Sequence, residues 1–190
     1  MKFLLNITVY FCVFLIVSCN DIYKHKDSDI VVFKKKSENT KLVIPKNILY
    51  HSPDSAAFDS AFIARAELKL YTFVNVSCPT CIQELIDLSE FVSLFGSVNI
   101  SLIPICGSTG GFEVFLHYLE TSISKRISPY PIFLDYENQF IKLNQFMQEK
   151  RLQTVLTDES NTILLIGDPT KSEVIRDKYS TDIKRLMSTK

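Results

Sequence analysis

The sequence has no excess of charge of either sign, because 21 lysine and arginine residues balance 21 aspartate and glutamate residues. A neutral chain gives no electrostatic reason to expect a nucleic acid as partner. The sequence also lacks internal repeats, low-complexity segments, a phosphate-binding loop and a convincing Ser/His/Asp arrangement. What remains is ordinary globular composition: of 190 residues, 46% are apolar and 22% charged, which suits one domain with a sizeable core.

The N-terminal segment is the exception to this ordinary composition. Lys2 precedes an almost unbroken apolar stretch from Phe3 to Val17, and the small residues Ser18 and Cys19 follow. A basic start, an apolar stretch and a small-residue cleavage site are typical of an export signal. A transmembrane anchor is the alternative, but the stretch is shorter than the roughly 20 residues that a spanning helix needs. We therefore expect an exported protein.

The end of this segment, from Leu15 to Cys19, resembles a bacterial lipobox, in which the cysteine is lipidated and becomes the first mature residue. The resemblance implies a lipoprotein signal peptide over residues 1–18 and a lipid anchor on Cys19. The protein would then be a membrane-anchored lipoprotein of the periplasm or cell envelope. Residues 19–44 are largely polar and would form a tether, and residues 45–190 would form the folded domain.

The five cysteines divide according to this prediction. Cys12 lies in the signal and Cys19 would carry lipid, so Cys78, Cys81 and Cys106 belong to the folded domain. Disulfides form and persist outside the cytoplasm, so the close pair Cys78 and Cys81 is expected to cycle or to bridge. Cys106 ends a predicted strand, and we interpret it as a small buried apolar residue in preference to a third redox thiol.

Apolar patterns predict strands and helices in alternation. A continuous apolar run is typical of a strand buried on both faces, whereas apolar residues at intervals of three and four indicate a helix. The predicted strands cover residues 68–76, 98–105, 131–134, 153–157 and 162–166, and the predicted helices cover residues 79–95, 112–123, 140–146 and 175–186.

The order of these elements predicts an α/β fold with a mixed sheet. The alternation at the start favours parallel strands, and the turn from Asp158 to Asn161 favours an antiparallel hairpin at the end. Residues 41–67 are expected to form an extended edge segment and an irregular or helical connection. Asp135 and Asp158 end strands and are expected to cap turns, and His117 is expected to face solvent.

The tetrapeptide CPTC, from Cys78 to Cys81, lies between a predicted strand and a predicted helix. It could be a redox dithiol, half of a metal site or a static disulfide. A c-type haem site would need a histidine where Ile82 stands, and a zinc ribbon would need a second C-x-x-C, which the sequence lacks. A peroxiredoxin motif would need proline and threonine where Tyr71 and Asn75 stand. The strand-then-helix context favours the redox dithiol.

A strand that ends in C-x-x-C at a helix start, followed by a βα unit and a ββα tail, resembles the thioredoxin-like fold. The lipobox and the strand YPIFLD resemble the membrane-anchored branch related to TlpA, which includes many lipoproteins of Bacteroidetes. The resemblance covers residues 45–188 and implies a three-layer sandwich of order β-α-β-α-β-β-β-α. It also implies a thiol–disulfide oxidoreductase that uses Cys78 and Cys81, needs no cofactor and has protein thiols or disulfides as partners.

The chemistry of the pair can also be argued from its position. Cys78 would occupy the exposed start of a helix, where free N–H groups and the helix dipole stabilise a thiolate. Such positions lower a thiol pKa from about 8.5 into the range of roughly 3.5 to 7.5. Cys78 would attack a partner disulfide, and Cys81, one turn later and partly covered, would resolve the mixed disulfide.

Three positions depart from the pattern of the thioredoxin-like fold. Gln153 stands where the fold normally places a cis-proline that faces the dithiol, so Gln153 and Thr154 are the expected substrate-groove residues. Ser77 and Thr72 stand where the family often has an aromatic residue and a buried acid. These departures leave an alternative function open, a non-enzymatic binding module with a structural disulfide that docks a protein partner or a metal. The sequence assigns no metal ligands.

Overall fold

The computed structural model describes residues 40–51, 66–96, 99–123 and 131–188. The predicted signal peptide, the lipidation site Cys19 and nearly all of the predicted tether lie outside these residues. Within the described ranges, no helix has the length and the apolar character that crossing a membrane requires. Contacts with the domain occur ahead of residue 45, since Lys41 pairs with Thr162 and Leu42 is buried.

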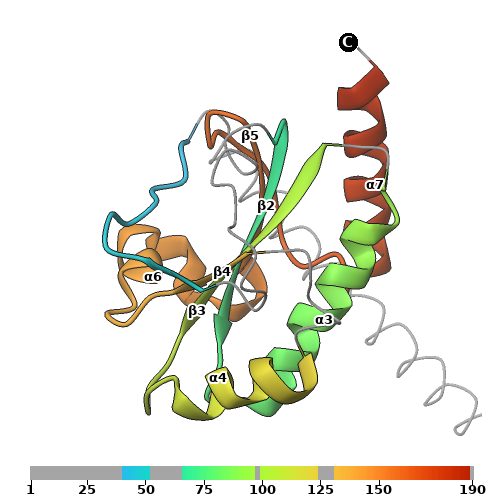
Figure 1. Ribbon diagram of the computed structural model, residues 1–190. Coiled ribbons are helices and arrows are strands. Elements are labelled where there is room, and N and C mark those ends of the chain that lie inside the picture. Colours follow the sequence, from blue (N-terminus) through green and yellow to red (C-terminus); the bar gives the residue numbers. More distant parts are fainter. Residues whose placement is uncertain (1–39, 52–65, 97–98, 124–130, 189–190) are drawn as a thin grey trace, which may run out of the picture. The chain divides into compact units, whose positions relative to one another are not determined.

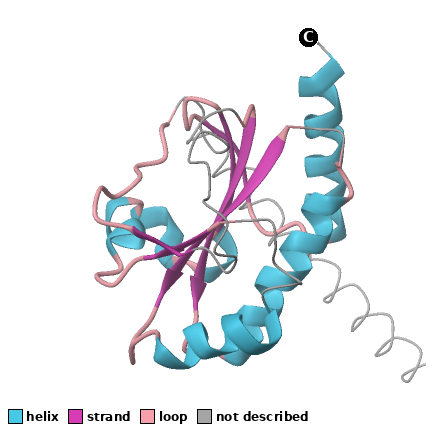
Figure 2. Cartoon of the chain, viewed as in Figure 1, coloured by secondary structure: helices cyan, strands magenta, loops and turns pink. Residues whose placement is uncertain are grey.

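A single mixed sheet of six strands organises the described part of the chain (Figures 1 and 2). Its order is β1-β4-β3-β2-β5-β6, in which β2, β3 and β4 are parallel and β1, β5 and β6 are antiparallel to their neighbours. The prediction of an α/β fold with a mixed central sheet is confirmed. The strands are β1 (Leu49–His51), β2 (Leu68–Asn75), β3 (Ile100–Gly107), β4 (Ile132–Leu134), β5 (Thr154–Asp158) and β6 (Ile163–Ile166).

Helices cover both faces of this sheet. The long helices α3 (Pro79–Ser93) and α7 (Glu173–Ser188) lie on one face, with α4 (Glu113–Tyr118) beside α3 (Figure 1). Helix α6 (Gln139–Leu143) lies on the other face. The remaining turns are a π-helical turn, η1, and two 3₁₀ turns, η2 and η3; their bounds are η1 (Leu119–Ile123), η2 (Gln145–Gln148) and η3 (Lys150–Leu152).

The central strand β2 is buried along almost its whole length because its side chains alternate between two cores. Leu70 and Val74 belong to the core under α3 and α7, which also holds Leu85 and Tyr179. Tyr71 points to the opposite face, where its ring lies 6.3 Å from that of Phe140 in α6. Burial on both faces explains why this strand is a continuous apolar run in the sequence.

The predicted boundaries need small corrections. Helix α3 ends at Ser93 instead of residue 95, and β3 begins at Ile100 instead of residue 98, which lies outside the described residues. The predicted helix 112–123 changes from α to π geometry at Leu119. The predicted helix 140–146 is divided between α6 and η2, and η3 was not predicted. The expected edge segment in residues 41–67 corresponds to β1.

Two aspartates close turns as the sequence predicted. Asp135 is buried after β4, and its carboxylate accepts hydrogen bonds from the backbone N–H groups of Gln139 and Phe140 at 2.9 and 2.7 Å. It thereby satisfies donors that the start of α6 leaves unpaired. Asp158 accepts a hydrogen bond from the backbone N–H of Ser160 at 2.9 Å in the β5–β6 hairpin.

Helix α3 carries the candidate thiols, so its packing decides where they lie. Leu85 is fully buried in the core under α3, whereas Leu94, at the end of the same helix, is 76% exposed. We expect Leu85→Ala to lower the free energy of unfolding by about 2 to 5 kcal/mol, because it removes buried contacts and leaves a cavity. Urea denaturation of the full chain measures this.

The matched control is Leu94→Ala, which we expect to change the free energy of unfolding by less than about 0.5 kcal/mol. Equal effects of the two substitutions would contradict the packing described for α3.

Candidate functional site

The two cysteines lie at the junction of β2 and α3, and hydrogen bonds hold this turn in place. The backbone N–H of Cys78 donates to the carbonyl of Asn75 at 3.2 Å, and the Asn75 side chain accepts from the N–H of Ser77 at 3.1 Å. The Ser77 hydroxyl bonds to that of Ser108 at 2.9 Å and accepts from the N–H of Thr109 at 3.2 Å. The β2–α3 turn is therefore joined to the loop that follows β3.

A glycine at the end of β3 permits this close approach. A Cβ atom at Gly107 would collide with the side chain of Asn138 and with the ring of Phe73. The carbonyl of Gly107 accepts a hydrogen bond at 2.9 Å from the N–H of Val76, which directly precedes the turn that carries the thiols. The small residue at this point thus lets β2 and β3 stay paired up to the site.

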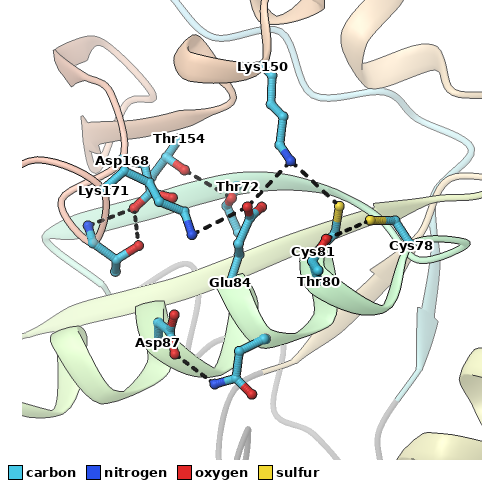
Figure 3. Close-up of polar contacts among 12 residues, drawn as sticks. Thr72, Cys78, Thr80, Cys81, Glu84, Asp87, Lys150, Thr154, Asp168 and Lys171 are labelled. Atoms are coloured by element: carbon cyan, nitrogen blue, oxygen red, sulfur yellow. Dashed lines mark hydrogen bonds and ion pairs between the residues drawn. The ribbon is translucent and has the colours of Figure 1, made fainter.

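Cys78 is the N-cap residue of α3, as the sequence predicted. Its backbone is extended, with φ −117° and ψ 114°, and Pro79 occupies the first helical turn, where its missing N–H costs nothing. The Cys78 residue is partly exposed, and its sulfur lies 3.0 Å from the Thr80 hydroxyl (Figure 3). Hydrogen bonds from the Cys81 thiol and then from Thr80 lower the pKa of Cys78 to about 7.

Cys81 lies one turn further along α3 and has the opposite environment. Its side chain is buried in the core under α3, and burial raises the pKa of the Cys81 thiol to about 11. Both cysteines are free thiols in this structure. The pair therefore combines one accessible sulfur that ionises near neutral pH with one covered sulfur that stays protonated.

Lys150 approaches the Cys81 sulfur, and Glu84 and Lys171 extend this contact into a small charged cluster (Figure 3). The Lys150 ammonium, from η3, lies 4.0 Å from the Cys81 sulfur and 3.4 Å from a carboxylate oxygen of Glu84 in α3. Lys171, which follows β6, also lies 3.4 Å from that oxygen. The sequence interpretation missed all three charged residues. Glu84 follows Cys81 by three residues on a predicted helix, so helical spacing could have identified it, but no local pattern indicates Lys150.

Gln153 and Thr154 lie immediately after η3, at the start of β5. The carbonyl of Gln153 accepts a hydrogen bond from the N–H of Phe73 in β2 at 2.9 Å. The Thr154 hydroxyl lies 3.1 Å from that of Thr72, and both side chains are buried. The segment that contains Gln153 therefore lies close to the thiols, because Lys150, three residues earlier, contacts Cys81. A substrate-groove role for Gln153 and Thr154 stays a prediction.

The other candidate residues lie apart from this chemistry. Cys106 is fully buried in the core under α3, and burial raises the pKa of its thiol, which agrees with its interpretation as a small apolar residue. His117 is exposed on α4, as expected. Among the residues that the structure describes, no group of three or more His, Cys, Asp or Glu side chains could hold a metal ion.

An apolar groove of about 540 Å³ lies beside Cys78, between α3 and α4. Ser77 and Pro79, the two neighbours of Cys78 in sequence, are among the residues that line it. Its walls include Ile82 from α3 and Val114 from α4, and none of the described residues that line it is charged. The groove therefore offers an uncharged surface next to the more accessible thiol.

No protein-family model and no curated protein matches this chain. The fold is similar to that of the thioredoxin domain of a thiol–disulfide oxidoreductase from Bacteroides vulgatus, with 12% identity and a TM-score of 0.51 over 77% of this chain and 97% of that one. It is also similar to ScoI from Arabidopsis thaliana, solved with copper bound, with 11% identity and a TM-score of 0.51 over 76% and 99% of the two chains. The predicted thioredoxin-like fold is confirmed.

The contrast between the two thiols gives a pH dependence that can be measured. Iodoacetamide reacts with thiolates, so the alkylation rate of Cys78 in the reduced protein should rise through a midpoint near pH 7. Cys81 should stay unmodified until the solution is strongly alkaline, because its pKa is raised to about 11. Peptide mass spectrometry after timed alkylation measures both rates.

The matched variant is Thr80→Val, which keeps the shape of the side chain and removes its hydroxyl. We expect the Cys78 midpoint to move upward by roughly half a unit to one unit, since one hydrogen bond to the thiolate is lost. A midpoint of about 8.5 in the unmodified protein, the value of an ordinary thiol, would contradict the site.

Proposed function

We propose that this protein is a thiol–disulfide oxidoreductase that exchanges electrons with protein disulfides through Cys78 and Cys81. The observation that carries the proposal is the position of Cys78 at the start of α3, with its pKa lowered to about 7 beside the buried Cys81. A purely structural bridge does not require one accessible, readily ionised sulfur. Catalytic dithiols require this, because the thiolate is the attacking species.

In the reducing direction, the Cys78 thiolate attacks one sulfur of a partner disulfide. A bond forms between Cys78 and that sulfur, the partner disulfide breaks, and the other partner sulfur leaves as a thiolate. Cys81 then loses its proton to water and attacks the Cys78 sulfur. The products are a Cys78–Cys81 disulfide and a second partner thiolate, so two electrons have passed to the partner. Oxidation of a partner dithiol follows the same steps in reverse.

The apolar groove beside Cys78 supports a polypeptide as the partner in this exchange. A partner held by a mixed disulfide to Cys78 would have the residues next to its own cysteine near Ser77 and Pro79, which line the groove. The absence of charge among the described lining residues favours apolar side chains at these partner positions.

A variant that cannot complete the exchange tests this function. Cys81→Ser removes the resolving thiol, so attack by Cys78 should leave partner proteins attached through a mixed disulfide. We expect adducts of higher mass on non-reducing gels of cells that express the full chain, and their loss on reduction.

The control is the double variant Cys78→Ser with Cys81→Ser, which should form no adducts. The reduction potential of the native pair separates the proposal from a binding module with a static bridge. A potential well below about −300 mV together with no trapped partner would identify a structural disulfide and refute the oxidoreductase.

We also propose that the protein acts outside the cytoplasm, as a lipoprotein attached to a membrane through Cys19. The support comes from the sequence alone: the order of Lys2, the apolar stretch Phe3–Val17 and the lipobox-like residues Leu15–Cys19. An oxidising compartment is also where a protein disulfide persists long enough to serve as a substrate.

Mass spectrometry of the mature protein tests the anchor. We expect the chain to begin at Cys19 and to carry the added mass of acyl chains, and the protein to sediment with membranes. Cys19→Ser should abolish the added mass and release the folded domain from the membrane fraction. An unmodified N-terminus at Met1 in the native chain would disprove the proposal.

A further inference from the structure

Lys150 is the cation that approaches the buried thiol most closely among the contacts of this site. It lies in η3, on a segment distant in sequence from α3, and its ammonium nitrogen is 4.0 Å from the Cys81 sulfur (Figure 3). The Lys150 side chain is 66% exposed, so packing does not require it at this position. Glu84 and, after it, Cys81 raise the pKa of Lys150, so the side chain is an ammonium ion at neutral pH.

Glu84 holds Lys150 in this position without neutralising it fully. The same Glu84 oxygen lies 3.4 Å from Lys150 and 3.4 Å from Lys171, so one carboxylate is shared between two ammonium groups. Asp168, the other nearby acid, accepts hydrogen bonds from the N–H and hydroxyl of Thr170 at 2.7 Å each. Lys150 therefore keeps positive charge that can act on the neighbouring sulfur.

We propose that the Lys150 ammonium stabilises negative charge on the Cys81 sulfur whenever that sulfur leaves or attacks during disulfide exchange. This inference rests on the proposed function, in which Cys81 is the resolving residue. Lys150 would be a catalytic residue in the strict sense, because it contacts a reacting atom.

The exchange at Cys78 and Cys81 needs no reactant other than the partner thiolate. When a partner thiolate attacks Cys78 in the oxidised protein, a bond forms between the two sulfurs and the Cys78–Cys81 bond breaks. The electron pair of the broken bond goes to the Cys81 sulfur, which becomes a thiolate beside Lys150. In the opposite direction, the same thiolate attacks Cys78 in the mixed disulfide and expels the partner thiolate.

The environment of Cys81 explains why a cation is needed there. Burial opposes a thiolate at this position, and it is the main reason that the pKa of Cys81 is raised. Cys78 and Glu84 act in the same direction as burial, whereas Lys150 lowers this pKa. The hydroxyls of Thr72 and Thr154 are paired with each other at 3.1 Å and carry no charge. The described contacts thus make Lys150 the source of positive charge nearest to the sulfur.

The test measures how fast dithiothreitol reduces the Cys78–Cys81 disulfide of the full chain, at neutral pH and low salt. We expect Lys150→Met to slow the reaction roughly three- to tenfold, because a poorly stabilised thiolate is a worse leaving group. Lys150→Arg, which keeps the charge, should restore most of the rate. The deficit of the Met variant should shrink as sodium chloride is added, since the ammonium is exposed.

Lys171→Met is the matched control, because it removes an ammonium that lies at the same distance from Glu84 but, among the described contacts, does not reach the Cys81 sulfur. It should slow the reaction by less than about twofold. A Lys150→Met rate within twofold of the native rate would overturn the inference, and so would an equal loss in both variants. Urea denaturation shows whether Lys150→Met also lowers the free energy of unfolding. A purely structural role of Lys150 would require such a loss.

The test of Lys150 and the test of the proposed function can fail independently. Reduction by dithiothreitol needs no protein partner, so Lys150 can be tested even if Cys81→Ser traps nothing in cells. Conversely, trapping by Cys81→Ser together with an unchanged rate for Lys150→Met would refute the role of Lys150 alone.

Discussion

Helix α3 rests on the sheet through an apolar stripe that includes Cys81 and Leu85, and this packing separates the two thiols. A spacing of three residues places Cys78 and Cys81 on the same side of a helix, but only the second is inside the core. Cys78 remains at the N-terminus, where the unpaired N–H groups of the helix favour a negative charge. The difference in solvation between the two sulfurs follows from where the helix begins relative to the core.

Much of the fold could be predicted because the information is local. The apolar run of β2 and the helical spacing of α3 locate the CPTC tetrapeptide at a strand–helix junction, and this junction assigns different environments to Cys78 and Cys81. The path of residues 144–152 could not be predicted in the same way. Their two 3₁₀ turns have no apolar periodicity of their own, and η3 is what brings Lys150 to Cys81. Ion pairs between distant segments depend on tertiary geometry, which composition and spacing do not encode.

The charged groups around Cys81 are placed differently from those expected from the resemblance to the thioredoxin-like fold. Thr72 stands where an acid is often found, and its hydroxyl is paired with that of Thr154, so this part of the interior is neutral. The charges that act on Cys81 come instead from the rim of the site, where Lys150 and Glu84 have access to water. Charges at a rim respond to ionic strength and can rearrange more readily than buried ones. The reactivity of the pair therefore depends on solution conditions as well as on the fold.

The burial of Cys106 has a consequence for how the domain would mature. If the chain is exported as proposed and folds in an oxidising compartment, its three domain cysteines could form wrong pairs before the fold is complete. Once β3 is part of the sheet, Cys106 is fully enclosed and its thiol is kept protonated by burial, so it can neither attack nor be attacked. Among the three cysteines that the structure describes, folding thus protects Cys106 from oxidation and leaves Cys78 and Cys81 as the pair that can form a disulfide. The fold itself would thus select the correct disulfide, because it removes Cys106 from the cysteines that can react.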